Sequence, residues 1–239
     1  VQGSDRTDSA LLDDLRSQGI DVFLEQDGSH VPHDCDLFVY SEAVPADAPE
    51  RQKAVEYGIE QESYFQALGS LSRDYNVVAV CGTSGKSSTT SMAARVLVDA
   101  GLDPTVVVGT KVPDLDGRNW RAGTSDLFLL EACEYRGSFH YLSPNIVLLS
   151  NVKHDHVDAY ADAASYEQSF IDFLKLLPDD GPVITHGGDQ HCAQVIARAD
   201  RQLIDADEQP LIDLQTPGMH MQQNAQLVLA LADQLGIDH

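Results

Sequence analysis

The sequence predicts an α/β protein in two parts, a partial Rossmann-like N-terminal domain followed by a domain with a mostly parallel sheet. Three observations carry this prediction. Short apolar segments alternate with amphipathic helical segments along the chain. The apolar segments of the second half are almost continuously apolar, which is typical of parallel strands covered on both faces. A loop of small residues joins one such segment to a long helix, as in alternating β/α folds.

The first domain is expected to span residues 1–72. A capped helix is predicted at 9–19, because Leu11, Leu12 and Leu15 fall on one face. The remaining predicted elements are strands at 20–24, 36–40 and 58–60 and helices at 49–57 and 63–71. Their alternation predicts a parallel sheet.

The second domain is expected to span residues 73–239. It opens with a strand at 76–81, a loop, and a helix at 86–100 that Gly101 ends. Pro, Asp and Gly cluster at 113–119, which predicts a loop or a hairpin. Further strands are predicted at 106–108, 127–132, 145–150, 181–185 and 202–204, and helices at 165–177 and 222–235.

Composition narrows the class of protein. The chain has 239 residues, of which 43% are hydrophobic and 22% charged, so it can bury a sizeable core. Its formal net charge of −23 favours solubility and opposes nucleic acid and anionic membranes as partners. No apolar run reaches the roughly 20 residues that span a bilayer. We therefore expect no membrane insertion, no nucleic-acid partner, and a monomer or weak dimer.

The cysteines indicate a reducing compartment. Cys35, Cys81, Cys133 and Cys192 are widely spaced, with neither a CxxC pair nor metal-ligand spacing. We therefore expect a cytoplasmic protein whose cysteines are thiols.

The loop after the strand 76–81 has the composition of an anion-binding site. The sequence VVAVCGTSGKSS at 77–88 combines an apolar strand, two glycines and Lys-Ser opening a helix. Glycine lets backbone approach phosphate closely, and a helix N-terminus offers free N–H groups. Lys86 would reach the β- and γ-phosphates and Ser87 would ligate Mg²⁺. The alternative is a surface turn with a solvated lysine, since Val80 stands where the full motif has glycine. The candidate ATP-binding residues are Gly82, Thr83, Ser84, Gly85, Lys86, Ser87 and Ser88.

Two further side chains follow strands and predict a Mg²⁺ site. Glu131 ends the strand at 127–132, and His156 lies six residues after the strand at 145–150. Ligands of open α/β sheets bind at the carboxyl ends of the strands, where the loop also lies. Glu131, His156 and Ser87 could therefore surround a Mg²⁺ ion that bridges phosphates. Zinc at His154 and His156, or a surface histidine beside a helix cap at Asp155, are the alternatives.

The last helix begins with polar residues that share a face. His220 and Asn224 are four positions apart in PGMHMQQN at 217–224. A helix start with polar first-turn residues is the alternative to a binding role.

These stretches together resemble the Mur ligase family of ATP-dependent amide-bond-forming enzymes. The stretches are GTSGKSS at 82–88, EACEYRGSF at 131–139, NVKHDHVDAY at 151–160 and PGMHMQQN at 217–224. In the first half, GSD at 3–5 and SEAVPADAPE at 41–50 resemble the family's UDP-binding domain. The resemblance is strongest with the branch that adds L-alanine to UDP-N-acetylmuramic acid during peptidoglycan precursor synthesis, and it implies a P-loop-type ATPase fold for the second domain.

The resemblance implies a reaction and residue roles. ATP activates the substrate carboxylate as an acyl phosphate, which the amine of L-alanine then attacks. Catalytic roles fall on Lys86 at the phosphates and on Glu131 and His156, which serve Mg²⁺ together with Ser87. Asn151 would position the phosphate region. The remaining implied contacts are His220 and Asn224 at the adenine nucleotide and Asp5 and Ser41 at the UDP part.

Departures from the family pattern leave alternatives open. Met221 stands where the family commonly has Asn, so this chain departs from the family at the implied adenine contact. The family's N-terminal strand would precede Gly3 and its third domain would follow His239, so we expect a piece of a longer ligase without turnover of its own. A ligase that adds a tripeptide to the same UDP-sugar, and a non-catalytic nucleotide-binding relative, are the competing hypotheses. A folylpolyglutamate-type ligase shares the loop but not the EACEY stretch.

Overall fold

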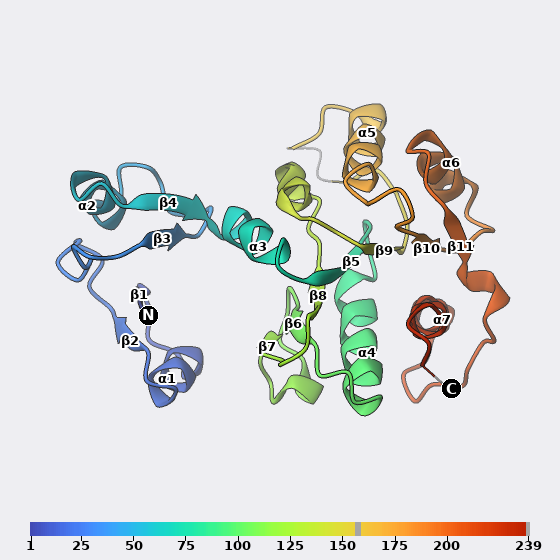
Figure 1. The fold of residues 1–239 in the computed structure, drawn as a ribbon, viewed down its shortest axis with the longest axis horizontal. Coiled ribbons are helices and arrows are strands. Elements are labelled where there is room, and N and C mark those ends of the chain that lie inside the picture. Colours follow the sequence, from blue (N-terminus) through green and yellow to red (C-terminus); the bar gives the residue numbers. More distant parts are fainter. Residues whose placement is uncertain (156–158, 238–239) are drawn as a thin grey trace. The chain divides into compact units, whose positions relative to one another are not determined.

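The computed structural model describes residues 1–155 and 159–237. The chain divides into two compact units, Val1–Ala67 and Leu68–His239. Both units alternate strands with helices, and the second contains a seven-stranded, mostly parallel sheet (Figure 1). The predicted α/β fold class is therefore confirmed.

The first unit contains two small parallel sheets rather than one. β1 pairs with β2, and β3 pairs with β4. The helix α1 begins where the Ser9 hydroxyl accepts a hydrogen bond from the Leu12 amide. The bounds are β1 (Gln2–Ser4), α1 (Ala10–Ser17), β2 (Asp21–Phe23), β3 (Leu37–Tyr40), α2 (Pro49–Glu56) and β4 (Glu60–Ser63), and α3 (Tyr64–Ser72) begins at the end of the unit.

Two predictions for this unit are wrong in detail. A strand lies at Gln2–Ser4, whereas the first strand predicted for this chain is the one at 20–24. The strand predicted at 58–60 lies at Glu60–Ser63, because Gly58 adopts a φ of 70° in the turn that follows α2.

The second unit is built on the sheet order β11-β10-β9-β5-β8-β6-β7, in which only the β6–β7 pair is antiparallel. The hairpin alternative at 113–119 is thereby confirmed. The helix α6 was not predicted. The strands are β5 (Asn76–Cys81), β6 (Thr105–Val107), β7 (Trp120–Arg121), β8 (Leu127–Glu131), β9 (Ile146–Leu149), β10 (Val183–Thr185) and β11 (Leu203–Asp205). The helices are α4 (Lys86–Asp99), α5 (Ala163–Leu174), α6 (Gln190–Arg198) and α7 (Met219–Gln234), with short 3₁₀ segments at Pro113–Leu115, Tyr135–Tyr141 and Ala206–Glu208.

Helices cover both faces of this sheet. Alternate residues of β5 point to opposite sides, as the pleat of a strand requires. Val77, Ala79 and Cys81 join a core with α5 and α6, whereas Val78 and Val80 join a core with α4 and α7. Figure 1 shows these two helix pairs on either side of the sheet. The continuous apolar character of the strands follows from this double burial.

The carboxyl ends of three adjacent strands meet at one edge. β5 lies between β8 and β9, with Val80 opposite Glu131 and Cys81 opposite Leu149. The loop that leaves β5 therefore emerges beside Glu131 on one side and beside the segment after β9 on the other.

Candidate functional site

The loop between β5 and α4 needs glycine at both of its turning points. Gly82 has a φ of 128° and Gly85 a φ of 88°, which side-chain-bearing residues rarely adopt. A Cβ on Gly82 would lie 2.2 Å from Ser150 Oγ and 2.8 Å from the Asn151 carbonyl oxygen. Both glycines are therefore required by conformation and by close packing.

The segment after β9 holds the loop in place through hydrogen bonds. The Ser84 amide donates to Asn151 Oδ1 at 3.2 Å, and Asn151 Nδ2 donates to the Ser84 carbonyl at 2.9 Å. The Ser150 hydroxyl donates to the same carbonyl at 2.6 Å. The Thr83 hydroxyl donates to the Lys153 carbonyl and accepts from the Lys153 amide, each at 2.8 Å. The predicted neighbourhood of Asn151 and the loop is therefore present.

Lys86 lies at the first position of α4 and turns back toward the loop. Its Nζ donates to the Gly82 carbonyl at 2.6 Å and forms an ion pair of 2.9 Å with Glu134. A lysine in this place puts a positive charge beside the free N–H groups of the helix start, which is where an anion binds.

Ser87 and Glu131 lie together. The Ser87 hydroxyl donates to Glu131 Oε1 at 3.1 Å, and the Gly109 amide donates to Oε2 at 2.7 Å. A hydroxyl and a carboxylate are the hard oxygen ligands that Mg²⁺ prefers, so the pair fits a divalent cation that also contacts phosphate. His156, the third predicted ligand, lies outside the described residues. Within residues 1–155 and 159–237, no group of three or more His, Cys, Asp or Glu side chains has a metal-binding arrangement.

A cavity of about 710 Å³ opens beside the loop. The predicted residues Asn151, His220 and Asn224 all contribute to its lining, as does Met221. Asn224 is buried, whereas His220 is exposed. Pockets of a few hundred Å³ that carry a small number of polar groups are typical of small-ligand sites.

The lining of this cavity also includes a buried histidine. His186 Nδ1 lies 2.7 Å from Asp207 Oδ1, and the Gly188 amide donates to Asp207 Oδ2 at 2.9 Å. These contacts lower the pKa of Asp207, the Gly188 hydrogen bond being the larger cause and His186 the smaller. Asp207 is therefore a fixed anion that orients the imidazole ring.

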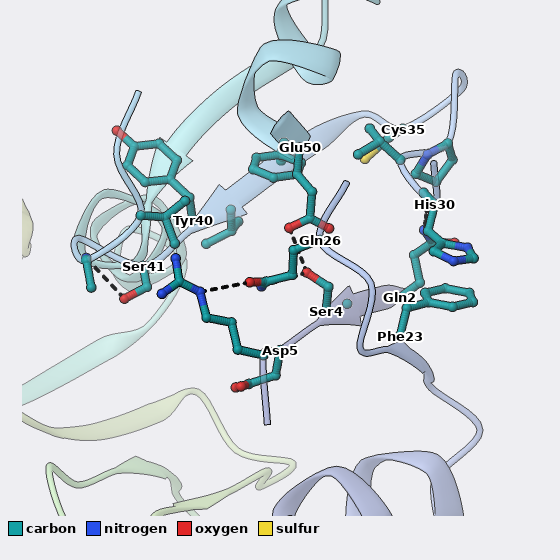
Figure 2. A pocket seen from close by; sticks show the side chains of 18 of the residues that line it. Gln2, Ser4, Asp5, Phe23, Gln26, His30, Cys35, Tyr40, Ser41 and Glu50 are labelled. Atoms are coloured by element: carbon teal, nitrogen blue, oxygen red, sulfur yellow. Dashed lines mark hydrogen bonds between the residues drawn. The ribbon is translucent and has the colours of Figure 1, made fainter. Parts of the chain in front are cut away.

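A second cavity, of about 580 Å³, lies within the first unit. Asp5 and Ser41, the residues predicted to contact UDP, both line it and are labelled in Figure 2. Ser4 Oγ donates to Glu50 Oε2 at 2.8 Å across its wall. The Phe23 and His30 rings stack face to face at a centroid distance of 3.8 Å (Figure 2).

Several residues at these sites were not predicted individually. Glu134, Gly109, Ser150, and the His186–Asp207 pair reach the sites from separate parts of the chain. For Glu134 a signal existed, since it follows Glu131 by three residues in EACEY. The others carry no local pattern, because their roles arise from contacts between distant segments.

No helix within the described ranges combines the length and apolar character needed to cross a membrane.

Comparison with known proteins identifies relatives across both units. A family model described as the Mur ligase middle domain matches residues 80–209, and one described as the catalytic domain of the Mur ligase family matches residues 1–76. UDP-N-acetylmuramate–L-alanine ligase of Clostridium novyi is 37% identical over 205 residues, which cover 85% of this chain and 44% of that protein. The chain thus spans less than half the length of this relative.

Solved structures agree in fold. UDP-N-acetylmuramate–alanine ligase of Thermotoga maritima is 26% identical, with a TM-score of 0.78, over 100% of this chain and 60% of that one. UDP-N-acetylmuramate:L-alanyl-γ-D-glutamyl-meso-diaminopimelate ligase of Neisseria meningitides has a TM-score of 0.87 over 100% of this chain and 86% of that one. Its identity is 23%, so that likeness concerns the fold alone.

Proposed function

The chain belongs to the Mur ligase family, and from this premise we propose that it binds ATP and a UDP-sugar as part of a ligase that joins L-alanine to UDP-N-acetylmuramic acid. The observation that carries the proposal is the edge where β5, β8 and β9 end. Lys86, Ser87 and Glu131 converge there on a glycine-containing loop. The similarity to alanine-adding relatives supports the choice of substrates.

Each residue of this edge has a proposed role. Lys86 and the amide groups at the start of α4 bind the β- and γ-phosphates of ATP and neutralise their charge. Ser87 and Glu131 hold Mg²⁺, with His156 as a further proposed ligand outside the described residues. The bound ion would offset negative charge on the phosphates. Asn151 keeps the loop in its binding shape, and His220 and Asn224 flank the adenine nucleotide in the adjoining cavity.

The chemistry proposed for the whole enzyme has two steps. The carboxylate oxygen of UDP-N-acetylmuramic acid attacks the γ-phosphorus, and ADP leaves. The amine of L-alanine then attacks the acyl carbon, and inorganic phosphate leaves. Because phosphoryl transfer depends mainly on positioning and charge neutralisation, Lys86 and the loop amides supply what this step requires of the described residues.

The cavity of the first unit is the proposed UDP site. Its volume of about 580 Å³ suits a nucleotide-sized ligand. The stacked Phe23 and His30 rings offer a flat surface for a base, and Arg6 and Ser41 lie among the lining residues as donors to a diphosphate. Asp5 is proposed to accept a hydrogen bond from the UDP part.

Isothermal titration with ADP, in the presence and absence of Mg²⁺, tests the nucleotide site. We expect Mg²⁺ to strengthen ADP binding to the unaltered chain. Glu131→Gln should remove most of that gain, at least tenfold in Kd, because a neutral amide is a poor Mg²⁺ ligand. Asp172→Asn, which removes an exposed carboxylate of α5, is the matched control. Equal Mg²⁺ dependence in the unaltered chain and in Glu131→Gln would contradict the metal assignment.

Titration with UDP tests the other unit. UDP should bind the unaltered chain, and Phe23→Ala should weaken that binding without changing the affinity for ADP. Failure of the unaltered chain to bind UDP at millimolar concentration would contradict the proposed UDP site while leaving the nucleotide site intact.

A further inference from the structure

Lys86 is paired with a carboxylate that is sealed inside the second unit. Its Nζ lies 2.9 Å from Glu134 Oε2 and 3.1 Å from Oε1. The Glu134 side chain is 0% exposed and the Lys86 side chain 14%. A carboxylate at this depth is strongly destabilising unless a cation accompanies it, so the pair is a built feature of the fold.

Besides Glu134, Lys86 contacts two carbonyl oxygens of the loop. An ammonium group has three N–H bonds. One is used by the Gly82 carbonyl at 2.6 Å and one by Glu134. The third has a contact of 3.4 Å with the Thr83 carbonyl, which is long for a hydrogen bond. Short contacts therefore hold Lys86 on two sides, and the third N–H bond is held only by the longer contact.

Glu134 is itself fixed by surrounding elements. The Gly137 amide donates to its carbonyl at 2.9 Å, where the left-handed residues Arg136 and Gly137 turn the chain back. Tyr160 also donates to this carbonyl. The Tyr166 hydroxyl lies 3.4 Å from Oε1 and 2.9 Å from Thr83 Oγ1, so α5 links Glu134 to the loop. Burial raises the pKa of Tyr166, which keeps this hydroxyl protonated as a donor.

We infer that Glu134 is a positioning residue for nucleotide binding, whose buried carboxylate holds the Lys86 ammonium where it meets phosphate. The inference rests on the proposed function, because it takes the phosphates of ATP or ADP as the ligand of Lys86. A lysine that is already ordered loses little side-chain freedom when phosphate binds, so the affinity for phosphate-bearing nucleotides rises.

Electrostatic repulsion between Glu134 and phosphate opposes the positioning effect. The direction in which the affinity for ADP changes therefore tells which of the two dominates. Glu134 is negative and lies on the protein side of Lys86, so it also repels phosphate. If repulsion dominated, neutralising Glu134 would tighten the binding of ADP. If positioning dominates, as we infer, neutralising it weakens that binding although a repulsive charge has been removed.

The test measures the Kd of Mg²⁺·ADP and of adenosine by titration calorimetry. Glu134→Gln should weaken Mg²⁺·ADP binding about tenfold and leave adenosine binding unchanged, since adenosine has no phosphate. Glu167→Gln removes a carboxylate from α5 at a distance from the loop, where Glu167 pairs with Arg198, and should change neither Kd. Unchanged or tighter Mg²⁺·ADP binding by folded Glu134→Gln would overturn the inference.

A double variant separates positioning from a general loosening of the loop. In a Lys86→Met background, adding Glu134→Gln should leave the Kd of Mg²⁺·ADP unchanged or lower it, because there is no ammonium left to position and only the repulsion by Glu134 is removed. A further loss would show that Glu134 acts on the loop itself, and would overturn the inference.

Folding of each variant is checked by thermal melting. If Glu134→Gln does not fold, Glu134→Asp serves in its place. This variant keeps the charge but withdraws it by one methylene group, and it should weaken Mg²⁺·ADP binding about threefold. Affinity equal to that of the unaltered chain would overturn the inference. If the unaltered chain itself fails to bind Mg²⁺·ADP, the proposed function fails first, and that outcome is distinct from any ranking of the variants.

Discussion

Asn224 of α7 packs against Gly85 of the phosphate loop, so closely that a Cβ on Gly85 would lie 2.9 Å from Asn224 Oδ1. The two residues are far apart in sequence. Their contact links the last helix to the turn that opens α4. Both residues line the cavity beside the loop.

Gly85→Ala should therefore destabilise the second unit more than an ordinary glycine replacement. Gly101→Ala is the matched control, since Gly101 also has a positive φ, of 78°, but nothing within 4 Å of a Cβ. The control should cost about 1 kcal/mol from backbone strain alone. Gly85→Ala should lower the free energy of unfolding, measured in urea, by more than the control does. In an Asn224→Ala background, adding Gly85→Ala should cost only about as much as the control, because Asn224 Oδ1 is no longer there. Equal losses for the two single glycine variants would argue against the close contact.

The two hydrogen bonds between Asn151 and Ser84 predict a specific effect of Asn151→Asp. The change removes the bond donated by Nδ2 to the Ser84 carbonyl and adds a negative charge beside the loop. ADP binding, measured by fluorescence or calorimetry, should weaken at least tenfold. Asn119→Asp also removes one amide-to-carbonyl bond, to Val108, at the β6–β7 hairpin. ADP affinity should not change in that control, and an equal loss in both variants would contradict a local role for Asn151.

The stacked aromatic pair Phe139 and Phe173, the latter on α5, should contribute strongly to the stability of the second unit. Phe139 is 1% exposed and stacks on Phe173 at a centroid distance of 4.3 Å. Phe139→Ala should lower the free energy of unfolding by about 3–5 kcal/mol, because it leaves a cavity as well as losing buried area. Leu176→Ala removes a side chain that is 43% exposed and should cost about 0.5 kcal/mol or less. A loss near 1 kcal/mol for Phe139→Ala would contradict the packing described.

Asp103 gives the hairpin region a predicted acid sensitivity. Hydrogen bonds from Thr124, and then the Arg121 guanidinium, lower the pKa of Asp103 from 3.8 to about 2. A lowered pKa in the folded state contributes stability that is present above pH 3.8 and is lost as the pH falls toward 2. Asp103→Asn should therefore be less stable than the unaltered chain at pH 7, and the difference should shrink between about pH 4 and pH 2. Urea unfolding at several pH values measures this.

The control for that titration is Asp116→Asn, which removes an exposed carboxylate from the same hairpin at a residue with a φ of 56°. Asparagine tolerates that conformation. If Asp116→Asn showed the same pH-dependent difference, general charge rather than Asp103 would be the cause.

The parts of the site that were predictable are those written in contiguous sequence. The phosphate loop occupies one strand, one turn and one helix start, so its residues reveal their neighbours directly. Glu131 was also predictable, because the last residue of a parallel strand must lie at the carboxyl edge. Its pairing with Ser87 follows from the adjacency of β5 and β8.

Other features depend on contacts that no local pattern encodes. Glu134 is buried because the left-handed pair Arg136–Gly137 reverses the chain and because α5 supplies Tyr166. The two-residue strand β7 is too short to show a period of two. The helix α6 is different, since Asp189 caps it and Cys192, Val195 and Ile196 form its apolar face. These residues are a local signal for a helix.

The alternation of β5 between two helical layers makes the phosphate loop a meeting point of the whole second unit. Side chains of β5 lie in both hydrophobic cores, and the loop begins where β5 ends. Ligand bound at such a junction protects the layers jointly, so a saturating nucleotide should raise the melting temperature of the unit as a single transition. At one hundred times its Kd, the ligand adds about 2.7 kcal/mol to the free energy of unfolding. A screen of nucleotides by thermal shift could therefore rank candidate ligands without any assay of turnover.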